Sequence, residues 1–366
     1  MNVVMIPSVS GGLGHIGRTA ALARMLRTLD PAVTVEYLLD ADRLRPFNID
    51  AAAATGFRVN LLPARNRANR DAIVRACLGQ ADVIVEDTSR HLIPLRAIVP
   101  RAAWVSIPMY PLGDELFMDW PFLAQTDAVV WPYPRLLDFP PELAHVKANV
   151  IETGPFLALE GIPTRDDARA GLGVGEGEAI VLYAPRGMSF GRPFGERVLA
   201  GVFGAVDRLR VQRPRLRLAL AAVSRPEELH APGVPRELPD WVSVLGMISP
   251  TRMLEWVSAA DIAVTEGSNM TFEAAALGTP IVMVPGPIFE TWLLGTRLHE
   301  QGAARIVWIE RVTPESIGEV FREILDDPTR REATCDKARS LVSGGGGVLA
   351  AGRLVLDLGR SQPLSG

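Results

Sequence analysis

Short apolar runs alternate along the first part of the chain with stretches in which apolar residues recur every three or four positions. The runs are typical of buried parallel strands, and the stretches predict helices. We expect strands at residues 3–6, 33–38, 58–62, 83–85 and 103–107, and helices near residues 18–29, 50–55 and 70–78. Strands that alternate with helices in this way predict a doubly wound parallel sheet.

A second series of the same kind follows a segment that breaks the pattern. Residues 161–177 are rich in glycine, proline and charge, as linkers between domains commonly are. We expect further strands at 179–183, 217–222, 242–245, 262–264 and 281–284, and helices near 194–210, 251–259 and 270–277. The chain is therefore predicted to be an α/β protein with two Rossmann-like domains, residues 1–155 and 156–345, and a final helical stretch over residues 346–366.

Composition narrows the classes of partner. The formal net charge is −4, and a surface that reads nucleic acid normally needs a basic excess, so no nucleic-acid partner is expected. The two cysteines, Cys77 and Cys335, lie far apart in the sequence and have no metal-ligand neighbours, which predicts neither a disulfide framework nor a zinc site.

Met1 leads directly into a strand, and no uncharged apolar run is long enough to cross a membrane. We expect a cytoplasmic protein without stable membrane insertion, and the sequence does not fix its oligomeric state.

The turn after the first strand carries the first candidate chemistry. Residues 10–18 read SGGLGHIGR, so four glycines and a histidine lie where the strand passes into a helix. Glycines allow close backbone approach, and the first amides of a helix present unsatisfied donors with the positive end of the dipole. The turn therefore predicts an anion site, and we expect Gly14 to contact the diphosphate of the donor. Because histidine changes charge near neutral pH, His15 is a candidate general base at that site.

A general base of this kind is commonly oriented by a carboxylate. Asp87, which follows the strand at residues 83–85, is the best-placed candidate, and Glu86 is the alternate. Two plainer interpretations stay open: His15 could cap its helix, and Asp87 could cap a loop. The other four histidines have no comparable setting and are expected to be structural or on the surface: His91, His145, His230 and His299.

A second loop follows the same logic in the C-terminal half. The strand at residues 262–264 leads into a small polar loop whose amides and hydroxyls open a helix and could hold a diphosphate. The residues of this loop are Gly267, Ser268, Asn269, Met270 and Thr271. Glu273 follows near the start of the helix, where its carboxylate can accept hydrogen bonds from ribose hydroxyls. The alternative is that Glu273 only complements the helix dipole.

Together these segments resemble the GT-B glycosyltransferases, especially the peptidoglycan UDP-GlcNAc transferase and the natural-product or UDP-glycosyltransferase branch. The resemblance spans most of the chain. It rests on a glycine turn with a histidine after the first strand and on a Gly/Ser/Thr loop that leads into Glu273-Ala274-Ala275 and then Gly278-Thr279-Pro280. It implies a GT-B fold with two domains facing a cleft, the acceptor in the first and the nucleotide sugar in the second. It also implies that the last helix packs back on the N-terminal domain.

The resemblance also implies roles for residues farther along the chain. Met247 or Ile248 would meet the nucleotide base, while Glu290 and Thr291 fall where polar side chains touch donor-sugar hydroxyls. Arg186 is a further candidate for stabilising the leaving diphosphate. The chain departs from the pattern at two places. Glu266-Gly267 stands where many members have His-Gly-Gly, and Glu290-Thr291 replaces an Asp-Gln or Gln-Gln pair.

The expected function is therefore inverting sugar transfer from a nucleotide-diphosphate sugar, with UDP as the expected nucleotide, to a hydroxyl of a small-molecule acceptor, in secondary metabolism or envelope biosynthesis. His15 and Asp87 would be catalytic, no metal ion would be needed, and the only cofactor-like group would be the nucleotide sugar itself.

Other functions compete with this interpretation. Gly12 to Gly17 fits GxGxxG and Asp40 follows the second strand, as in an NAD-dependent oxidoreductase, but that class explains neither His15 nor the second loop. A nucleotide-sugar hydrolase or epimerase on the same fold is closer, because sialic-acid-pathway hydrolases share a Gly-x-Gly-His-x-x-Arg turn and would activate water with this histidine. The aromatic, proline-rich segment Met109 to Pro134 favours an organic acceptor instead. A catalytically silent sugar-nucleotide binder is the third alternative.

Overall fold

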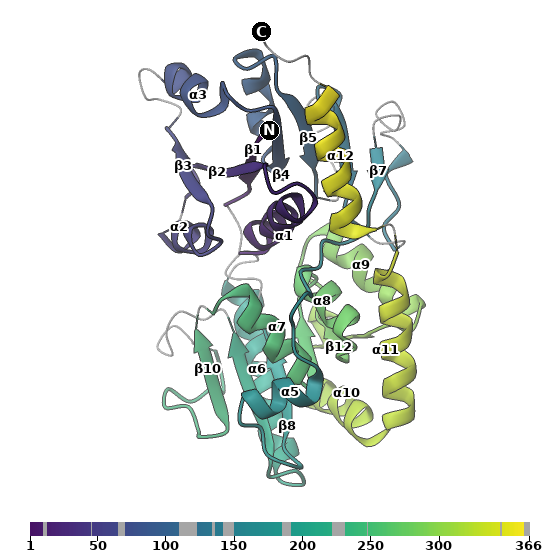
Figure 1. Cartoon of the computed structure of the whole chain (residues 1–366). Helices are drawn as coiled ribbons and strands as arrows, with labels where there is room; N and C mark the ends of the chain where they lie inside the picture. The colour runs from purple at the N-terminus through teal and green to yellow at the C-terminus, as the bar shows by residue number, and fades with distance from the viewer. Residues whose placement is uncertain are drawn as a thin grey trace. The chain divides into compact units, whose positions relative to one another are not determined.

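The computed structural model describes residues 1–9, 13–44, 46–64, 70–109, 123–133, 136–141, 150–184, 192–221, 231–246, 248–344 and 346–361. The chain forms two compact units, each around its own parallel sheet (Figure 1). Unit 1 comprises Met1–Ala158 and Gly344–Gly366, and unit 2 comprises Leu159–Ser343. Unit 1 is therefore built from both ends of the chain, and unit 2 from its middle.

The sheet of unit 1 has its strands in the order β3-β2-β1-β4-β5-β6-β7, all of them parallel. The strands are β1 (Asn2–Pro7), β2 (Thr34–Asp40), β3 (Arg58–Leu62), β4 (Val83–Asp87), β5 (Ala103–Ile107), β6 (Ala128–Trp131) and β7 (Val150–Glu152). The central strand β1 is buried on both faces, which explains its unbroken apolar run. Its pairing with β4 sets Pro7 opposite Asp87, so the turn after β1 lies beside the end of β4.

Helices cover both faces of this sheet. They are α1 (Gly14–Leu29), α2 (Pro46–Ala53), α3 (Arg70–Leu78), the 3-10 helix η1 (Arg90–Ala97) and α12 (Gly347–Ser361). One core joins α1 and α12 to the sheet, and a second core joins α3 and η1 to the opposite face. Figure 1 shows α12, in yellow, against this unit, and its Gly352 lies so close to Met25 and Leu29 of α1 that a larger side chain would press on both.

Because α12 completes the core of unit 1, a cavity in this helix should weaken the N-terminal unit. Val355 is fully buried in the core that contains α1. We expect Val355→Ala to lower the free energy of unfolding by about 2 kcal/mol, through lost burial and the cavity left behind. Urea titration followed by circular dichroism measures the loss. The exposed neighbour Arg353→Ala is the control, and equal effects of the two changes would contradict the packing role of α12.

The sheet of unit 2 has the strand order β10-β9-β8-β11-β12-β13, again parallel. The strands are β8 (Ala179–Tyr183), β9 (Leu216–Ala221), β10 (Val242–Gly246), β11 (Ile262–Thr265), β12 (Ile281–Met283) and β13 (Arg305–Ile306). The helices are α5 (Arg165–Gly171), α6 (Arg192–Arg210), α7 (Pro250–Ala259), α8 (Asn269–Leu277), α9 (Phe289–Glu300), α10 (Pro314–Asp326) and α11 (Pro328–Val342), with a short η5 (Ile309–Arg311). Apolar side chains of α6 and α10 form the main core with the strands.

One described stretch, Pro328–Ser361, is long and apolar enough by length and composition to cross a membrane. In the structure it consists of two helices, α11 and α12, of 15 residues each, and they belong to different units. A membrane-spanning helix needs about 20 consecutive residues, so neither helix is long enough alone. The apolar face of α12 is instead used in the core of unit 1.

Candidate functional site

The first candidate site lies where β1 passes into α1. The helix begins at Gly14 after Leu13, which has no side chain able to cap it, and its first turn contains no acidic residue. A helix start without a side-chain cap and without an acidic residue in its own first turn suits an anion. Residues 10–12 of the glycine turn lie outside the described residues.

The structure brings His15 and Asp87 together. The Nδ1 atom of His15 lies 2.9 Å from Oδ1 of Asp87, which is fully buried at the end of β4. Burial alone would raise the pKa of Asp87, but the charges of Arg18 and His15 and their hydrogen bonds outweigh it and hold this pKa well below its usual range. Asp87 is therefore ionised throughout the neutral range.

The ionised state of Asp87 determines which tautomer His15 adopts. A carboxylate without a proton only accepts hydrogen bonds, so the 2.9 Å contact places the hydrogen on Nδ1 of the imidazole. The lone pair of the neutral ring is then on Nε2. The side chain of His15 is 17% exposed, against 0% for Asp87, so the ring is open to a ligand while its partner is not. This arrangement suits a general base that takes a proton at Nε2.

Arg18 is a residue of this site that our sequence interpretation did not single out. It lies one helical turn after His15, and its Nε atom donates to Oδ2 of Asp87 at 2.8 Å. A terminal nitrogen of the same guanidinium donates to Oδ1, so the pair is bidentate and buried. The spacing of three residues on a helix was the available signal, because positions i and i+3 share a face.

Thr88 completes the surroundings of Asp87. Its hydroxyl donates to Oδ1 of Asp87 at 3.0 Å. Its φ of 57° is in the left-handed region, which makes it the one non-glycine residue with positive φ in the described part of the chain. Such a backbone is costly for a β-branched residue and is held only by its surroundings, as is common beside functional groups.

Glu86, the alternate partner for His15, serves another purpose. Side chains alternate along a strand, so Glu86 points to the face opposite Asp87. There its carboxylate accepts from the backbone amide of Ser89 at 2.7 Å and from the hydroxyl of Ser106. Those contacts fix the chain after β4 and leave Asp87 as the partner of His15 in this structure.

A second histidine–aspartate pair lies at the same edge of the sheet, on the face of α3 and η1. Nε2 of His91, in η1, lies 2.9 Å from Oδ2 of Asp40 at the end of β2. Burial raises the pKa of Asp40, but hydrogen bonds from His91 and from the backbone of Asp42 more than offset this and lower it. From the sequence, His91 is expected to be structural or on the surface, and Asp40 belongs to the dinucleotide-binding pattern. The observed pair ties η1 to β2.

The second candidate site lies between β11 and α8 in unit 2. Because α8 begins at Asn269, Asn269, Met270 and Thr271 form its first turn rather than a loop. Ser268 is the N-cap, but its side chain makes no capping hydrogen bond, whereas α5, α7, α10 and α11 all have side-chain caps. The start of α8 is thus left open for an anion.

The backbone conformation and the close neighbours of residue 267 require glycine at this position of the loop. Its φ is +87°, and a Cβ there would lie within 3 Å of side-chain atoms of Met283 and Thr291. No other residue fits without displacing them. The contact also shows that the loop after β11 lies against the start of α9, so the expected diphosphate and donor-sugar segments are neighbours.

Two expected ligand-binding hydroxyls have partners inside the protein. Thr271 is buried and donates to the hydroxyl of Thr265 at 2.9 Å. Thr291 is fully buried and donates to the carbonyls of Gly286, at 2.6 Å, and Ile288. Both hydroxyl hydrogens are thus used inside the protein, and the role of these two residues in binding a ligand stays a prediction. The backbone amide of Thr271 also has a partner, because it donates to the carbonyl of Ser268 at 2.9 Å.

Glu273 occupies the second turn of α8, near the start of the helix. Burial raises its pKa to about 7. Within the described ranges its carboxylate makes no hydrogen bond, which leaves both oxygens for a ligand with hydroxyl groups. Glu290, the expected donor-sugar residue, lies in the first turn of α9 and is 6% exposed.

Glu266, at the position of the missing histidine, is a buried carboxyl group. It is 2% exposed and accepts a hydrogen bond of 2.7 Å from the Tyr183 hydroxyl at the end of β8. Burial and the neighbouring Glu266 raise the pKa of Tyr183 well above its usual value, so this hydroxyl keeps its proton. The pair therefore joins the ends of β8 and β11 beneath the loop.

Several expected residues cannot be placed. Arg186 and Met247 lie outside the described residues, as do residues 110–122 of the aromatic segment. Ile248 is half-buried between β10 and α7. Among the residues that the structure describes, no group of three or more His, Cys, Asp or Glu side chains could hold a metal ion. The expectation that no metal is required stays a prediction.

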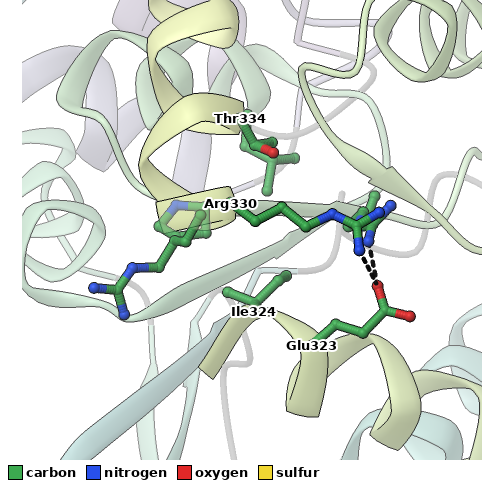
Figure 2. Close-up of a pocket in the computed structure, with 8 residues that line it drawn as sticks. Glu323, Ile324, Arg330 and Thr334 are labelled. Atoms are coloured by element: carbon green, nitrogen blue, oxygen red, sulfur yellow. Dashed lines mark hydrogen bonds and ion pairs between the residues drawn. The ribbon is translucent and has the colours of Figure 1, made fainter. Parts of the chain in front are cut away.

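Figure 2 shows a small pocket elsewhere in unit 2, between α10, α11 and the first residues of β12 and β13. Arg330 extends toward Glu323 across the pocket, and Arg305 also pairs with Glu323. The pocket lies at the amino ends of the strands, opposite the edge that carries Gly267 and Glu273. Ligands of open parallel sheets bind at the carboxyl ends, so this pocket is separate from the candidate site.

No protein-family model matches the chain, and no curated protein matches its sequence. Solved structures match it along nearly its whole length. The glycotransferase of kitacinnamycin has a TM-score of 0.65 at 19% identity, with 98% of each chain covered. The spinosyn forosaminyltransferase has a TM-score of 0.69 at 14% identity, covering 99% of this chain and 100% of that one. A structure titled as a UDP-N-acetylglucosamine 2-epimerase from Listeria monocytogenes has a TM-score of 0.69 at 12% identity, covering 97% and 94%.

Proposed function

For this chain, which has the GT-B fold, we propose an inverting, metal-independent glycosyltransferase that moves a sugar from a nucleotide-diphosphate sugar to a hydroxyl group of a small molecule. UDP is the proposed nucleotide. The observation that carries this proposal is the His15–Asp87 pair, with Nε2 of the imidazole left as the proton acceptor. Unit 1 would hold the acceptor and the base, and unit 2 would hold the donor.

Three features of unit 2 support a donor site. The uncapped start of α8 offers backbone amides to the diphosphate, with the Ser268 hydroxyl beside them. Glu273 has a carboxylate without hydrogen-bond partners in the described part of the chain, and ribose hydroxyls are donors that would satisfy it. Glu290 lies in the first turn of α9, whose Thr291 packs against Gly267, and we propose that its carboxyl group contacts a sugar attached to that diphosphate.

The proposed reaction is a single displacement. The acceptor hydroxyl gives its proton to Nε2 of His15 while its oxygen forms a bond to the anomeric carbon from the face opposite the diphosphate. The bond between that carbon and the diphosphate oxygen breaks, and its electron pair leaves with the diphosphate. Amides at the start of α8 stabilise the charge on the leaving group. The imidazolium that forms is oriented by Asp87.

The first test is ligand binding to the purified protein. A ligand that binds only the native state raises stability by RT ln(1 + [L]/Kd), about 2.7 kcal/mol at a hundredfold excess over Kd. We expect the melting temperature to rise with UDP, or with dTDP or GDP if the base differs, and not with NAD. A shift with NAD alone would contradict the transferase proposal and favour the dinucleotide interpretation of Gly12 to Gly17.

A nucleotide-sugar hydrolase or epimerase is the second candidate, because the Listeria monocytogenes structure shares the fold. In a hydrolase, His15 would take its proton from water instead of an acceptor. Product analysis separates the classes. A transferase leaves the donor sugar intact until an acceptor is added, whereas a hydrolase releases free sugar and an epimerase yields an isomeric donor without any acceptor.

A further inference from the structure

We propose that Arg70 binds an oxyanion, either a carboxylate or a phosphate group, which the acceptor carries in addition to the hydroxyl group that receives the sugar. The inference rests on the proposed function only where it identifies the ligand as the acceptor. The site itself is defined by Arg70, Asp40 and His91, which we call the Arg70 cluster.

Arg70 is an arginine whose hydrogen-bond donors are unused. It is the first residue of α3 and is partly buried. Its Nε atom is buried without a hydrogen-bond partner, and within the described ranges its guanidinium makes no hydrogen bond or ion pair. Buried donors in folded proteins are almost always bonded, so an unused one indicates a missing partner. The planar guanidinium matches the paired oxygens of a carboxylate or phosphate group.

Asp40 lies near Arg70 but does not pair with it. Burial raises the pKa of Asp40, while hydrogen bonds from His91 and the Asp42 backbone, together with positive charge that includes Arg70, lower it. Both oxygens of this carboxylate already have partners. Oδ2 lies 2.9 Å from Nε2 of His91, and Oδ1 accepts from the backbone amide of Asp42 at 3.1 Å. The guanidinium of Arg70 is therefore left for an oxyanion from outside the chain.

His91 offers the cluster a second polar contact. Because Nε2 of its ring faces Asp40, Nδ1 is the ring atom left for a ligand. The side chain of His91 is 20% exposed, against 4% for Asp40. A ligand can therefore reach the imidazole, whereas the carboxylate lies behind it.

The Arg70 cluster lies at the edge of the sheet where ligands of parallel sheets bind. Asp40 ends β2, α3 follows β3 and η1 follows β4, so the cluster is at the carboxyl ends of the strands, as Asp87 is. Only β1 separates β2 from β4, and a spacing of about 4.8 Å between strands puts the ends of β2 and β4 about 10 Å apart. A small molecule can span this distance. The proposed acceptor has its reacting hydroxyl at His15 and its acidic group on the other side of β1.

Binding of small anions tests the site without an acceptor and without an enzyme assay. The protein is titrated with acetate, inorganic phosphate and the uncharged acetamide at constant pH and ionic strength, and the ring signals of His91 are followed by NMR. These signals are identified by their loss in His91→Gln. The test variant is Arg70→Gln. The control is Arg101→Gln, at an exposed position just before β5, at the opposite edge of the sheet.

We expect saturable shifts of the His91 signals with acetate or phosphate and none with acetamide. The Kd should rise tenfold or more in Arg70→Gln and stay within a factor of two in Arg101→Gln. The anion with the lower Kd identifies the acidic group as a carboxylate or a phosphate.

Three results would overturn the proposal. They are the absence of saturable His91 shifts in the wild-type protein, equal binding by wild type and Arg70→Gln, and binding of acetamide as tight as that of acetate. An anion that shifts only the His15 signals occupies the glycine turn and also contradicts the Arg70 site. Should Arg70→Gln fail to fold, Arg70→Lys keeps the charge but loses the planar fork, and an unchanged Kd in that variant would refute the proposal.

Acceptor kinetics separate this inference from the proposed function. For two acceptors that differ only in a carboxylate and its amide, Arg70→Gln should raise the KM of the acid tenfold or more and leave the KM of the amide unchanged. If an anion binds at the Arg70 cluster but the protein transfers no sugar, the proposed function fails while the oxyanion site stands. If sugar is transferred and neither anion shifts the His91 signals, the oxyanion site fails alone.

Discussion

Replacing His15 by glutamine is expected to lower kcat for sugar transfer by about 10² to 10⁴ and to leave nucleotide binding unchanged. Glutamine preserves a polar side chain of similar length but cannot take up a proton from the acceptor. The loss should therefore appear in the chemical step, because the proposed nucleotide contacts belong to unit 2 apart from Gly14, and the substitution at His15 leaves Gly14 in place. Initial rates with the donor named by the thermal-shift screen, together with the Kd for the nucleoside diphosphate, measure the two quantities.

The matched control is His299→Gln. His299 is an exposed residue of α9 that is absent from the proposed machinery, so the same substitution there should leave kcat within a factor of two. If His15→Gln keeps the wild-type kcat, His15 is not the base. If it loses nucleotide affinity as well, the imidazole contributes to donor binding and the separation of roles between the units is wrong.

Replacing Glu273 by glutamine is expected to make the protein more stable above pH 7 and poorer at binding nucleotide. Burial raises the pKa of Glu273 to about 7 in the folded protein, against an ordinary value of 4.5. Between these two values the folded state holds a proton that the unfolded state releases, so stability falls as pH rises from about 4.5 to about 7 and stays reduced above. Glutamine removes this loss.

The stability gained by Glu273→Gln has an upper bound. This pKa shift of Glu273 corresponds to a gain of at most about 3 kcal/mol in the free energy of unfolding at pH 8. The gain is smaller if water reaches the partly buried carboxylate. At pH 4 the two proteins should differ little. Thermal unfolding at pH 4, 6 and 8 measures the trend, with Glu319→Gln, on the exposed face of α10, as the control. Equal stabilities of Glu273→Gln and wild type at pH 8 would show that the carboxyl group is well solvated.

The effect of Glu273→Gln on binding should run the other way. The ionised carboxylate would accept hydrogen bonds from two ribose hydroxyls, and losing charge-assisted bonds of this kind weakens binding by about tenfold or more. Calorimetric titration with the nucleoside diphosphate tests this, and it should also show wild-type affinity rising with pH through 7. A 2′,3′-dideoxy nucleotide should bind the wild-type and variant proteins alike. If the dideoxy nucleotide still binds the wild-type protein more tightly than Glu273→Gln, the ribose hydroxyls do not contact Glu273.

The strands and most helices could be predicted because each depends on a local apolar pattern. The runs at residues 103–107 and 179–183 coincide with β5 and β8, since strands buried on both faces are mainly apolar. The run at residues 58–62 coincides with β3, an edge strand that is only partly buried. The strands β6 and β7 were not expected. Each has three or four residues in a proline-rich region without a period, where only pairing in the sheet defines a strand.

The candidate site was predictable to the extent that it follows from topology. The turn after β1 and the end of β4 meet because parallel strands align their carboxyl ends, so His15 and Asp87 could be paired in advance. The hydrogen-bond partners of Thr271 and Thr291 could not be predicted, because residue spacing does not show which nearby carbonyl or hydroxyl oxygen a threonine hydroxyl bonds to. Arg18 was missed because its role depends on a buried carboxylate 69 residues away.

The return of the chain to unit 1 through α12 has a consequence for how the protein is made. A ribosome releases the polypeptide from its N-terminus, so every strand of the first sheet emerges before unit 2 is translated. The face of that sheet beside α1 must then wait, with Val355 and Leu356 still missing, until the final helix leaves the exit tunnel. Unit 2, by contrast, is one uninterrupted piece of chain and can complete its core first. During synthesis, the apolar side chains of unit 1 that pack against α12 therefore lack this cover until the helix has emerged.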